Sequence, residues 1–169
     1  MGTEIEHKFL ARTELLPPLA GGQRIIQGYL CLKPQVRFRL VEEAAATTAG
    51  PLLVITVKNL REDGSRFEVE TEKKDVAPSE AEEIKRLAIC PPIEKIRYRI
   101  PYGGLAWEVD LYQGRNAGLV TVDVETPYVG FPLDFPPWVD HHADITADPR
   151  YFNWNLGRCP FGLWQGADA

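Results

Sequence analysis

Hydrophobic and polar residues alternate along most of the chain, and this alternation predicts a protein built mainly of β-strands. Side chains two residues apart on a strand share a face, so a period of two marks a sheet with one apolar and one polar side. Arg37 and Arg39, for example, alternate with Val36, Phe38 and Leu40. The pattern predicts antiparallel strands at 3–10, 24–33, 36–42, 52–58, 67–73, 94–101, 104–113 and 120–127.

Helical patterns are a minority. The segment 78–88 begins with a proline, carries glutamates in its first turn and has Lys85 and Arg86 nearer its end, as a helix dipole favours. A second helical segment is predicted at 149–156. The sequence therefore predicts a mainly β protein with a few flanking helices.

The polar positions of the strands are almost all ionisable, and they separate by strand into basic and acidic rows. A solvated sheet face would mix charge with Ser, Thr and Gln, so this pattern favours an enclosed face that holds ions. The cations of these rows are Lys8, Arg37, Arg39, Lys58, Lys95, Arg97 and Arg99. The anions are Glu4, Glu6, Glu68, Glu70, Glu108, Asp110, Asp123 and Glu125.

A closed barrel of eight antiparallel strands would enclose such a face, because closure removes the sheet edges and leaves room for one small ligand. Its apolar outside must then be covered. The helix at 78–88, the aromatic C-terminal segment and a second copy of the chain are the candidates for this cover, so a homodimer is one expected assembly.

The chemistry of these rows indicates a phosphate ligand and a metal ion. Arg binds phosphate oxygens through two parallel hydrogen bonds and Lys binds them as a point charge. Carboxylates beside them would repel phosphate unless they hold Mg²⁺ or Mn²⁺, which prefer oxygen ligands and bridge to phosphates. Glu4 and Glu6 share a strand face and are suitably placed for one such ion.

Composition and charge exclude several other classes. The 169-residue chain has 19 basic and 24 acidic residues, a net charge of −5, which argues against a nucleic-acid partner or a basic membrane-surface helix. The uncharged run 44–57 contains Gly50 and Pro51 and is shorter than the about 20 residues that span a bilayer. The charged N-terminus lacks the apolar region of a secretory signal, so we expect no membrane partner and a cytoplasmic location.

Short motifs follow one another along the predicted strands in a characteristic order. They are EIEHK at 4–8, QGYL at 27–30, RFRL at 37–40, TVK at 56–58, RFEVE at 66–70, EKIRY at 94–98, WEVD at 107–110, VDVE at 122–125 and DPRYFN at 148–153. In order and spacing the chain resembles the CYTH superfamily of triphosphate tunnel metalloenzymes. The resemblance covers about 3–156 and implies a single CYTH-like domain over 1–169, with a C-terminal tail at 157–169.

The resemblance implies an eight-stranded tunnel that binds a triphosphate and needs a divalent metal ion, Mg²⁺ or Mn²⁺, for hydrolysis. Its last strand usually reads E-x-E, and the shorter Asp123 would contact the metal directly or through water. The implied metal ligands are Glu4, Glu6, Asp110, Asp123 and Glu125. The implied phosphate-binding residues are Lys8, Arg37, Arg39, Lys58, Lys95, Arg97 and Arg150. Supporting positions on the tunnel wall are Glu68, Glu70, Glu108 and Tyr29, the last as a gate with Arg150.

The prediction is a metal-dependent triphosphatase, with inorganic tripolyphosphate as substrate and Glu4, Glu6, Lys8 and Glu125 as the catalytic group. Either a carboxylate or Lys8 with a lowered pKa would accept the proton of the attacking water. A class IV adenylyl cyclase and a thiamine triphosphatase are alternatives within the same family. A polyphosphate- or nucleotide-binding module without turnover is the alternative outside enzymology.

Overall fold

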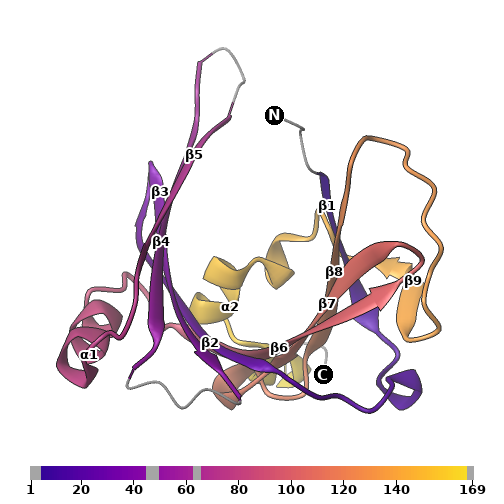
Figure 1. The fold of residues 1–169 in the computed structure, drawn as a ribbon, viewed down its shortest axis with the longest axis horizontal. Helices are drawn as coiled ribbons and strands as arrows, with labels where there is room; N and C mark the ends of the chain where they lie inside the picture. The colour runs from indigo at the N-terminus through magenta and orange to yellow at the C-terminus, as the bar shows by residue number, and fades with distance from the viewer. Residues whose placement is uncertain (1–4, 45–49, 63–65, 167–169) are drawn as a thin grey trace.

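The computed structural model describes residues 5–44, 50–62 and 66–166, and its main feature is one antiparallel sheet of nine strands in the order β5-β4-β3-β2-β6-β7-β8-β1-β9. Figure 1 shows this sheet as an open arch, with β3, β4 and β5 in one arm and β1, β7, β8 and β9 in the other. The strands are β1 (Ile5–Ala11), β2 (Gln23–Leu32), β3 (Gln35–Glu43), β4 (Leu52–Leu60), β5 (Arg66–Lys73), β6 (Ile93–Tyr102), β7 (Leu105–Tyr112), β8 (Val120–Thr126) and β9 (Val139–Asp144). The helices are α1 (Pro78–Arg86) and α2 (Asn153–Arg158), with short 3₁₀ turns at Thr13–Leu15, Gly114–Asn116, Pro149–Tyr151 and Phe161–Gly166.

The expected closed barrel of eight strands is not what the structure shows. In the described part of the chain β5 pairs only with β4, and β1 pairs with β8 and β9, so the two arms share no ladder of hydrogen bonds. The edge strands of the sheet are β5 and β9. β9 pairs with β1 at Phe9, Leu10 and Ala11, so it takes hydrogen-bonding positions that a closed barrel would use to join β1 to β5.

The predicted strands are confirmed, with shifts of a few residues at their ends, and one strand was missed. β9 pairs with β1 at Phe9, Leu10 and Ala11 across an irregularity in the register. The helix predicted at 78–88 is α1, and the segment 149–156 divides into a 3₁₀ turn and α2. None of the helices within the described ranges is long and apolar enough to cross a membrane.

The convex side of the arch carries the apolar residues of the strands and is covered in two places. One cluster holds Trp107, Val109 and Val122, all fully buried, against the segment that contains Phe135 and Trp138. On the other arm α1 covers a second cluster, and this cover confirms the role predicted for the helix. The second cluster contains Phe38, Leu40 and Val76, packed against Ala81 and Ile84 of α1.

A glycine on β2 allows that second cluster to pack closely. Gly28 pairs with Phe38 across the β2–β3 ladder, and a Cβ atom at Gly28 would lie 2.5 Å from the Phe38 ring. No real Cβ contact is that short, so a larger residue would push the ring away. The ring holds β3 in place, and β3 carries Arg37 and Arg39 on its other face.

The C-terminal segment closes the lower end of the inner face. Figure 1 shows α2 lying between the two arms. Leu156 of α2 is fully buried with Ile93 and Tyr112, which share the strand face of Lys95 and Asp110. These apolar side chains therefore lie beside Lys95 and Asp110 and exclude water from these two charged groups.

Candidate active site

The ionisable rows predicted from the sequence lie together on the inner face of the arch. Strand pairing places Lys8 opposite Asp123, Arg97 opposite Asp110, and Glu6 opposite Glu125. Residues directly opposite in an antiparallel pair point to the same side of the sheet. One face therefore carries basic and acidic side chains from both arms, as the alternation predicts.

Asp110 is the centre of the most buried group. Its side chain has no exposed surface, and its oxygens accept from Lys95 at 2.6 Å and from Arg97 at 2.7 and 2.8 Å. Burial alone would raise the pKa of the Asp110 carboxyl, but Lys95 and Arg97 hold it well below its usual range. Asp110 is therefore an anionic anchor for two cations, and both of its oxygens are engaged.

Lys95 shares the Asp110 carboxylate with Arg97, and the pKa of Lys95 is lowered by burial and by the charge of Arg97. The Lys95 side chain is 2% exposed, and burial together with the positive charge of Arg97 lowers its pKa to about 8, against the pull of Asp110. Arg97 also pairs with Glu108 and Asp123, so the positive and negative charges of this buried group are matched.

Lys8 has the opposite character. Its ammonium lies 2.7 Å from Asp123, and although burial disfavours the charge, Asp123 raises the pKa of Lys8 well above its usual value. Arg97 reaches the same carboxylate at 3.5 Å. Lys8 is thus held as an ammonium ion beside Asp123, which argues against a base with a lowered pKa at this position.

Arg37 and Arg39 lie two residues apart on the same face of β3, and each has an Nε–H donor with no acceptor among the described residues. The Nε atoms of both are buried and find no hydrogen-bond acceptor within the described residues. Burial and the positive charge of Arg37 lower the pKa of the Arg39 guanidinium, although its Nη2 atom contacts Glu70 at 3.1 Å. Buried donors that find no acceptor within the described residues are costly, so these two residues favour binding of an anion.

An acidic cavity of about 180 Å³ lies on the other arm. Its walls include Glu6, Glu108, Asp123 and Glu125, with Arg99 as the cation among them. The oxygen donors have the chemistry that Mg²⁺ and Mn²⁺ prefer. In the described ranges, however, no three acidic, His or Cys side chains are gathered closely enough to hold a metal ion.

Two predicted metal ligands, Glu4 and Asp110, are not among the described residues that line the acidic cavity. Glu4 lies outside the described residues, so its position relative to Glu6 and Glu125 is not part of the structure. Asp110 does not line the cavity, and its two oxygens instead bind Lys95 and Arg97. Among the predicted ligands that the structure describes, Glu6, Asp123 and Glu125 line the acidic cavity and have oxygen donors of the right chemistry, but they are not gathered closely enough to form a metal site as they stand.

The other predicted wall residues fall into ion pairs or hydrogen bonds. Lys58 contacts Glu68 at 3.3 Å with both side chains about half exposed. Tyr29 is buried and its hydroxyl accepts a hydrogen bond from Gln27 at 3.0 Å. Glu70 accepts from Arg39, as above, and from Thr56 at 3.1 Å, and Glu108 pairs with Arg97 and Arg99, each at 2.6 Å.

Arg150 was expected to reach the substrate or to gate the site with Tyr29. In the structure its guanidinium donates two hydrogen bonds to the Asp148 carboxylate, at 2.7 and 3.1 Å. The guanidinium also lies 5.7 Å from the ring centre of Trp164. These contacts hold Arg150 on the C-terminal segment. A direct contact with substrate stays a prediction.

Tyr112 is a site residue that the sequence analysis did not select. It is buried beneath Lys95, whose ammonium lies 5.6 Å from its ring centre, and its hydroxyl donates to Asn153 of α2 at 2.8 Å. Burial raises the pKa of the Tyr112 hydroxyl, which keeps it neutral. The signal was present, because Tyr112 has the same strand phase as Glu108 and Asp110.

Comparison with known proteins identifies close relatives of this arrangement. The chain is 35% identical over 164 residues to an inorganic triphosphatase from Acetivibrio thermocellus, covering 95% of this chain and 97% of the relative. The crystal structure of the inorganic triphosphatase NE1496 superposes with a TM-score of 0.61 at 26% identity, covering 93% of this chain and 95% of that one. A second structure of NE1496, described as a hypothetical protein, gives 0.60 at 27% identity, with 92% and 97% covered. No family model matches the chain.

Proposed function

The chain belongs to the CYTH family of triphosphate tunnel metalloenzymes, and we propose that it hydrolyses inorganic tripolyphosphate with the help of Mg²⁺ or Mn²⁺. The observation that carries the proposal is the pair of buried Arg37 and Arg39 Nε donors, which find no acceptor in the described part of the chain and lie among further cations on one face. The likeness to an inorganic triphosphatase over 95% of the chain supports the same substrate.

Phosphate binding is the role of the cations on β3, β4 and β6. Arg37 and Arg39 would each donate an Nε–H to a phosphate oxygen, which removes the cost of burying them unpaired. Lys95 and Lys58 would supply further positive charge at the deep and the exposed ends of the face. Catalysis of phosphoryl transfer is largely positioning and electrostatic stabilisation, and this cationic face provides both.

The acidic cavity fits the metal by its donor chemistry. Glu6 and Glu125 stand opposite one another on β1 and β8, and Asp123 lies two residues from Glu125 on the same face. A bound divalent ion would neutralise phosphate charge and lower the pKa of a coordinated water. The three carboxylates would hold that ion next to the terminal phosphate of the substrate.

The attacking water must lose a proton during hydrolysis. Lys8 is held as an ammonium ion by Asp123, so it orients this carboxylate and attracts phosphate rather than accepting the proton. A carboxylate of the acidic cavity is the better proton acceptor, because these carboxylates line the cavity proposed for the metal ion.

The test is turnover of tripolyphosphate, thiamine triphosphate and ATP, each with Mg²⁺, with Mn²⁺ and after chelation. Release of phosphate from tripolyphosphate only in the presence of metal is the expected result. Formation of cyclic AMP from ATP would identify a cyclase instead. Tight binding of tripolyphosphate with no product under any condition would identify a binding module.

A further inference from the structure

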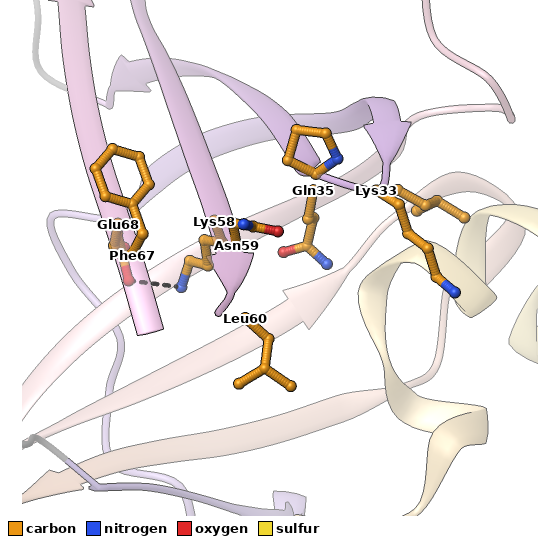
Figure 2. A pocket seen from close by; sticks show the side chains of 9 residues that line it. Lys33, Gln35, Lys58, Asn59, Leu60, Phe67 and Glu68 are labelled. Atoms are coloured by element: carbon orange, nitrogen blue, oxygen red, sulfur yellow. Dashed lines mark ion pairs between the residues drawn. The ribbon is translucent and has the colours of Figure 1, made fainter. Parts of the chain in front are cut away.

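Two cavities of the structure carry opposite charge. The larger, of about 460 Å³, lies where β4 ends and β5 begins, and its charged lining residues are Lys33, Lys58 and Glu68. Figure 2 shows Lys58 and Glu68 as an ion pair at its wall, with a contact of 3.3 Å. The acidic cavity, of about 180 Å³, is lined by four carboxylates, and Arg99 of β6 is the one cation among the described residues of its wall. The proposed metal site leaves the role of this arginine unexplained.

Strand pairing places Arg99 beside the carboxylates of the acidic cavity. Arg99, Glu108, Asp123 and Lys8 stand in one row across β6, β7, β8 and β1. Ala106 lies two residues before Glu108 on the same face of β7 and also lines the cavity. Its small side chain leaves the space into which the Arg99 guanidinium and the neighbouring carboxylates extend.

The carboxylates of this cavity are stabilised by a nearby cation. Glu6 and Glu125 are directly opposite one another on β1 and β8, and like charges in that position destabilise strand pairing. Arg99 brings positive charge to the cavity that both glutamates line. In the structure, Arg99 therefore offsets negative charge at the place proposed for the divalent ion.

Arg99 is held there by a weak contact. Its side chain is 72% exposed, and within the described ranges it donates one hydrogen bond, from Nη2 to Oε1 of Glu108 at 2.6 Å. Exposed ion pairs of this kind contribute little to stability. The other oxygen of Glu108 binds Nη1 of Arg97, also at 2.6 Å, so Glu108 keeps a counter-ion if Arg99 leaves. Arg99 is therefore able to exchange Glu108 for another anion.

We propose that Arg99 is an exchangeable cation of the acidic cavity, which offsets its carboxylates in the free enzyme and moves to the terminal phosphate when metal ion and triphosphate bind. The inference rests on the proposed function, because it uses the same cavity and the same substrate. It gives one residue opposite effects on two ligands. The guanidinium attracts phosphate through charge-assisted hydrogen bonds, and it repels a divalent ion from the cavity that both would share.

Arg99→Ala separates the two effects, and calorimetry on the full chain measures both without turnover. Tripolyphosphate, titrated in the presence of a chelator, should bind about tenfold more weakly, because one charge-assisted contact at an exposed position is lost. Mn²⁺, titrated in the absence of phosphate, should bind about five- to tenfold more tightly. That is the effect of removing one charge about 7 Å from a divalent ion in water, a distance equal to the diameter of a sphere with the volume of the cavity.

Arg99→Lys tests whether the charge is responsible. The substitution keeps the positive charge and removes the planar guanidinium. Its affinity for Mn²⁺ should equal that of the unsubstituted protein. An affinity for Mn²⁺ as high as that of Arg99→Ala would overturn the inference.

Arg24→Ala is the matched control. Arg24 is 48% exposed and pairs with Glu42 and Glu94, but it has the strand phase of Gly28 and lies on the convex side of the sheet. The substitution removes the same unit charge and should change either affinity less than about twofold, because distant exposed charges are screened.

The inference requires both shifts in Arg99→Ala. The absence of either shift, weaker binding of both ligands, or equal shifts in Arg24→Ala would overturn it and leave the proposed function standing. Failure of tripolyphosphate to bind the unsubstituted protein would overturn both.

Discussion

Replacement of Asp110 by Asn tests whether this carboxylate is the structural anchor of the charged face. The change keeps the shape of the side chain and removes its charge. Asp110 has no exposed surface, and it neutralises Lys95, which is 2% exposed, and Arg97, which is 16% exposed. In the variant Lys95 stays buried without its counter-ion, whereas Arg97 keeps its contacts with Glu108 and Asp123.

The magnitude follows from burial. Removal of one partner from a buried ion pair costs about 3 to 5 kcal/mol, because the remaining charge keeps its desolvation cost. Lys95 loses its counter-ion while Arg97 keeps Glu108, so we expect the lower part of that range. Domains of this kind have a free energy of unfolding of about 5 to 15 kcal/mol, so Asp110→Asn should consume a large share of it.

Urea unfolding followed by circular dichroism measures the loss. Glu68→Gln is the control, because its ion pair with Lys58 at 3.3 Å is about half exposed, and such pairs contribute about 0 to 1 kcal/mol. Lys95→Met added to Asp110→Asn removes the uncompensated cation and should restore part of the stability. Saturating tripolyphosphate should also restore part of it, since the ligand supplies negative charge to the same face.

A loss in Asp110→Asn no larger than the loss in Glu68→Gln would refute the reasoning. So would a further loss on adding Lys95→Met. Either result would mean that the buried cations do not depend on Asp110, and that the acidic rows do not balance the basic rows as the ion pairs indicate.

Three further predictions concern activity and binding. Glu6→Gln should abolish hydrolysis of tripolyphosphate with an unchanged circular dichroism spectrum, because it removes one of the proposed metal ligands; substantial residual turnover would contradict the metal site. Arg37→Ala should weaken tripolyphosphate binding by about 1.5 to 3 kcal/mol in calorimetry, since its buried Nε loses the acceptor that the ligand provides; unchanged affinity would count against the phosphate site. Because the pKa of Lys95 is lowered to about 8, its ammonium form is present below that pH and is lost above it, so the affinity for tripolyphosphate should fall as the pH rises through 8. Lys95→Met should flatten that part of the profile, and an identical profile in the variant would exclude Lys95 as its cause.

The sequence was sufficient to predict the strands and the contents of the inner face. Alternation fixes which side chains share a side, and this held for Arg37 and Arg39 on β3 as for Glu108 and Asp110 on β7. It was not sufficient for β9, whose residues Val139–Asp144 include adjacent histidines in place of a long apolar alternation. β9 depends on β1 for its pairing, which is a tertiary contact.

The alternation of polar and apolar residues could not predict whether the sheet closes into a barrel. Period two says which residues face inward, but it says nothing about whether the edge strands of the sheet, β5 and β9, meet. The same limit applies to the ion pairs. Arg97 and Asp110 lie on neighbouring strands of one hairpin and could have been paired from its register, whereas Lys8 and Asp123 are 115 residues apart. That contact depends on the complete strand order.

The strict separation of charged and apolar sides limits how the gene can change in length. Loss of a single codon within β6 would shift Lys95 and Arg97 out of phase with Asp110, and it would turn Ile96 and Tyr98 toward the phosphate-binding side. Insertions and deletions of odd length inside the strands therefore remove the charged face in one step, even where the strands still pair. Lineages of this protein should accumulate length variation in the connecting segments and keep the residue count of each charged strand constant.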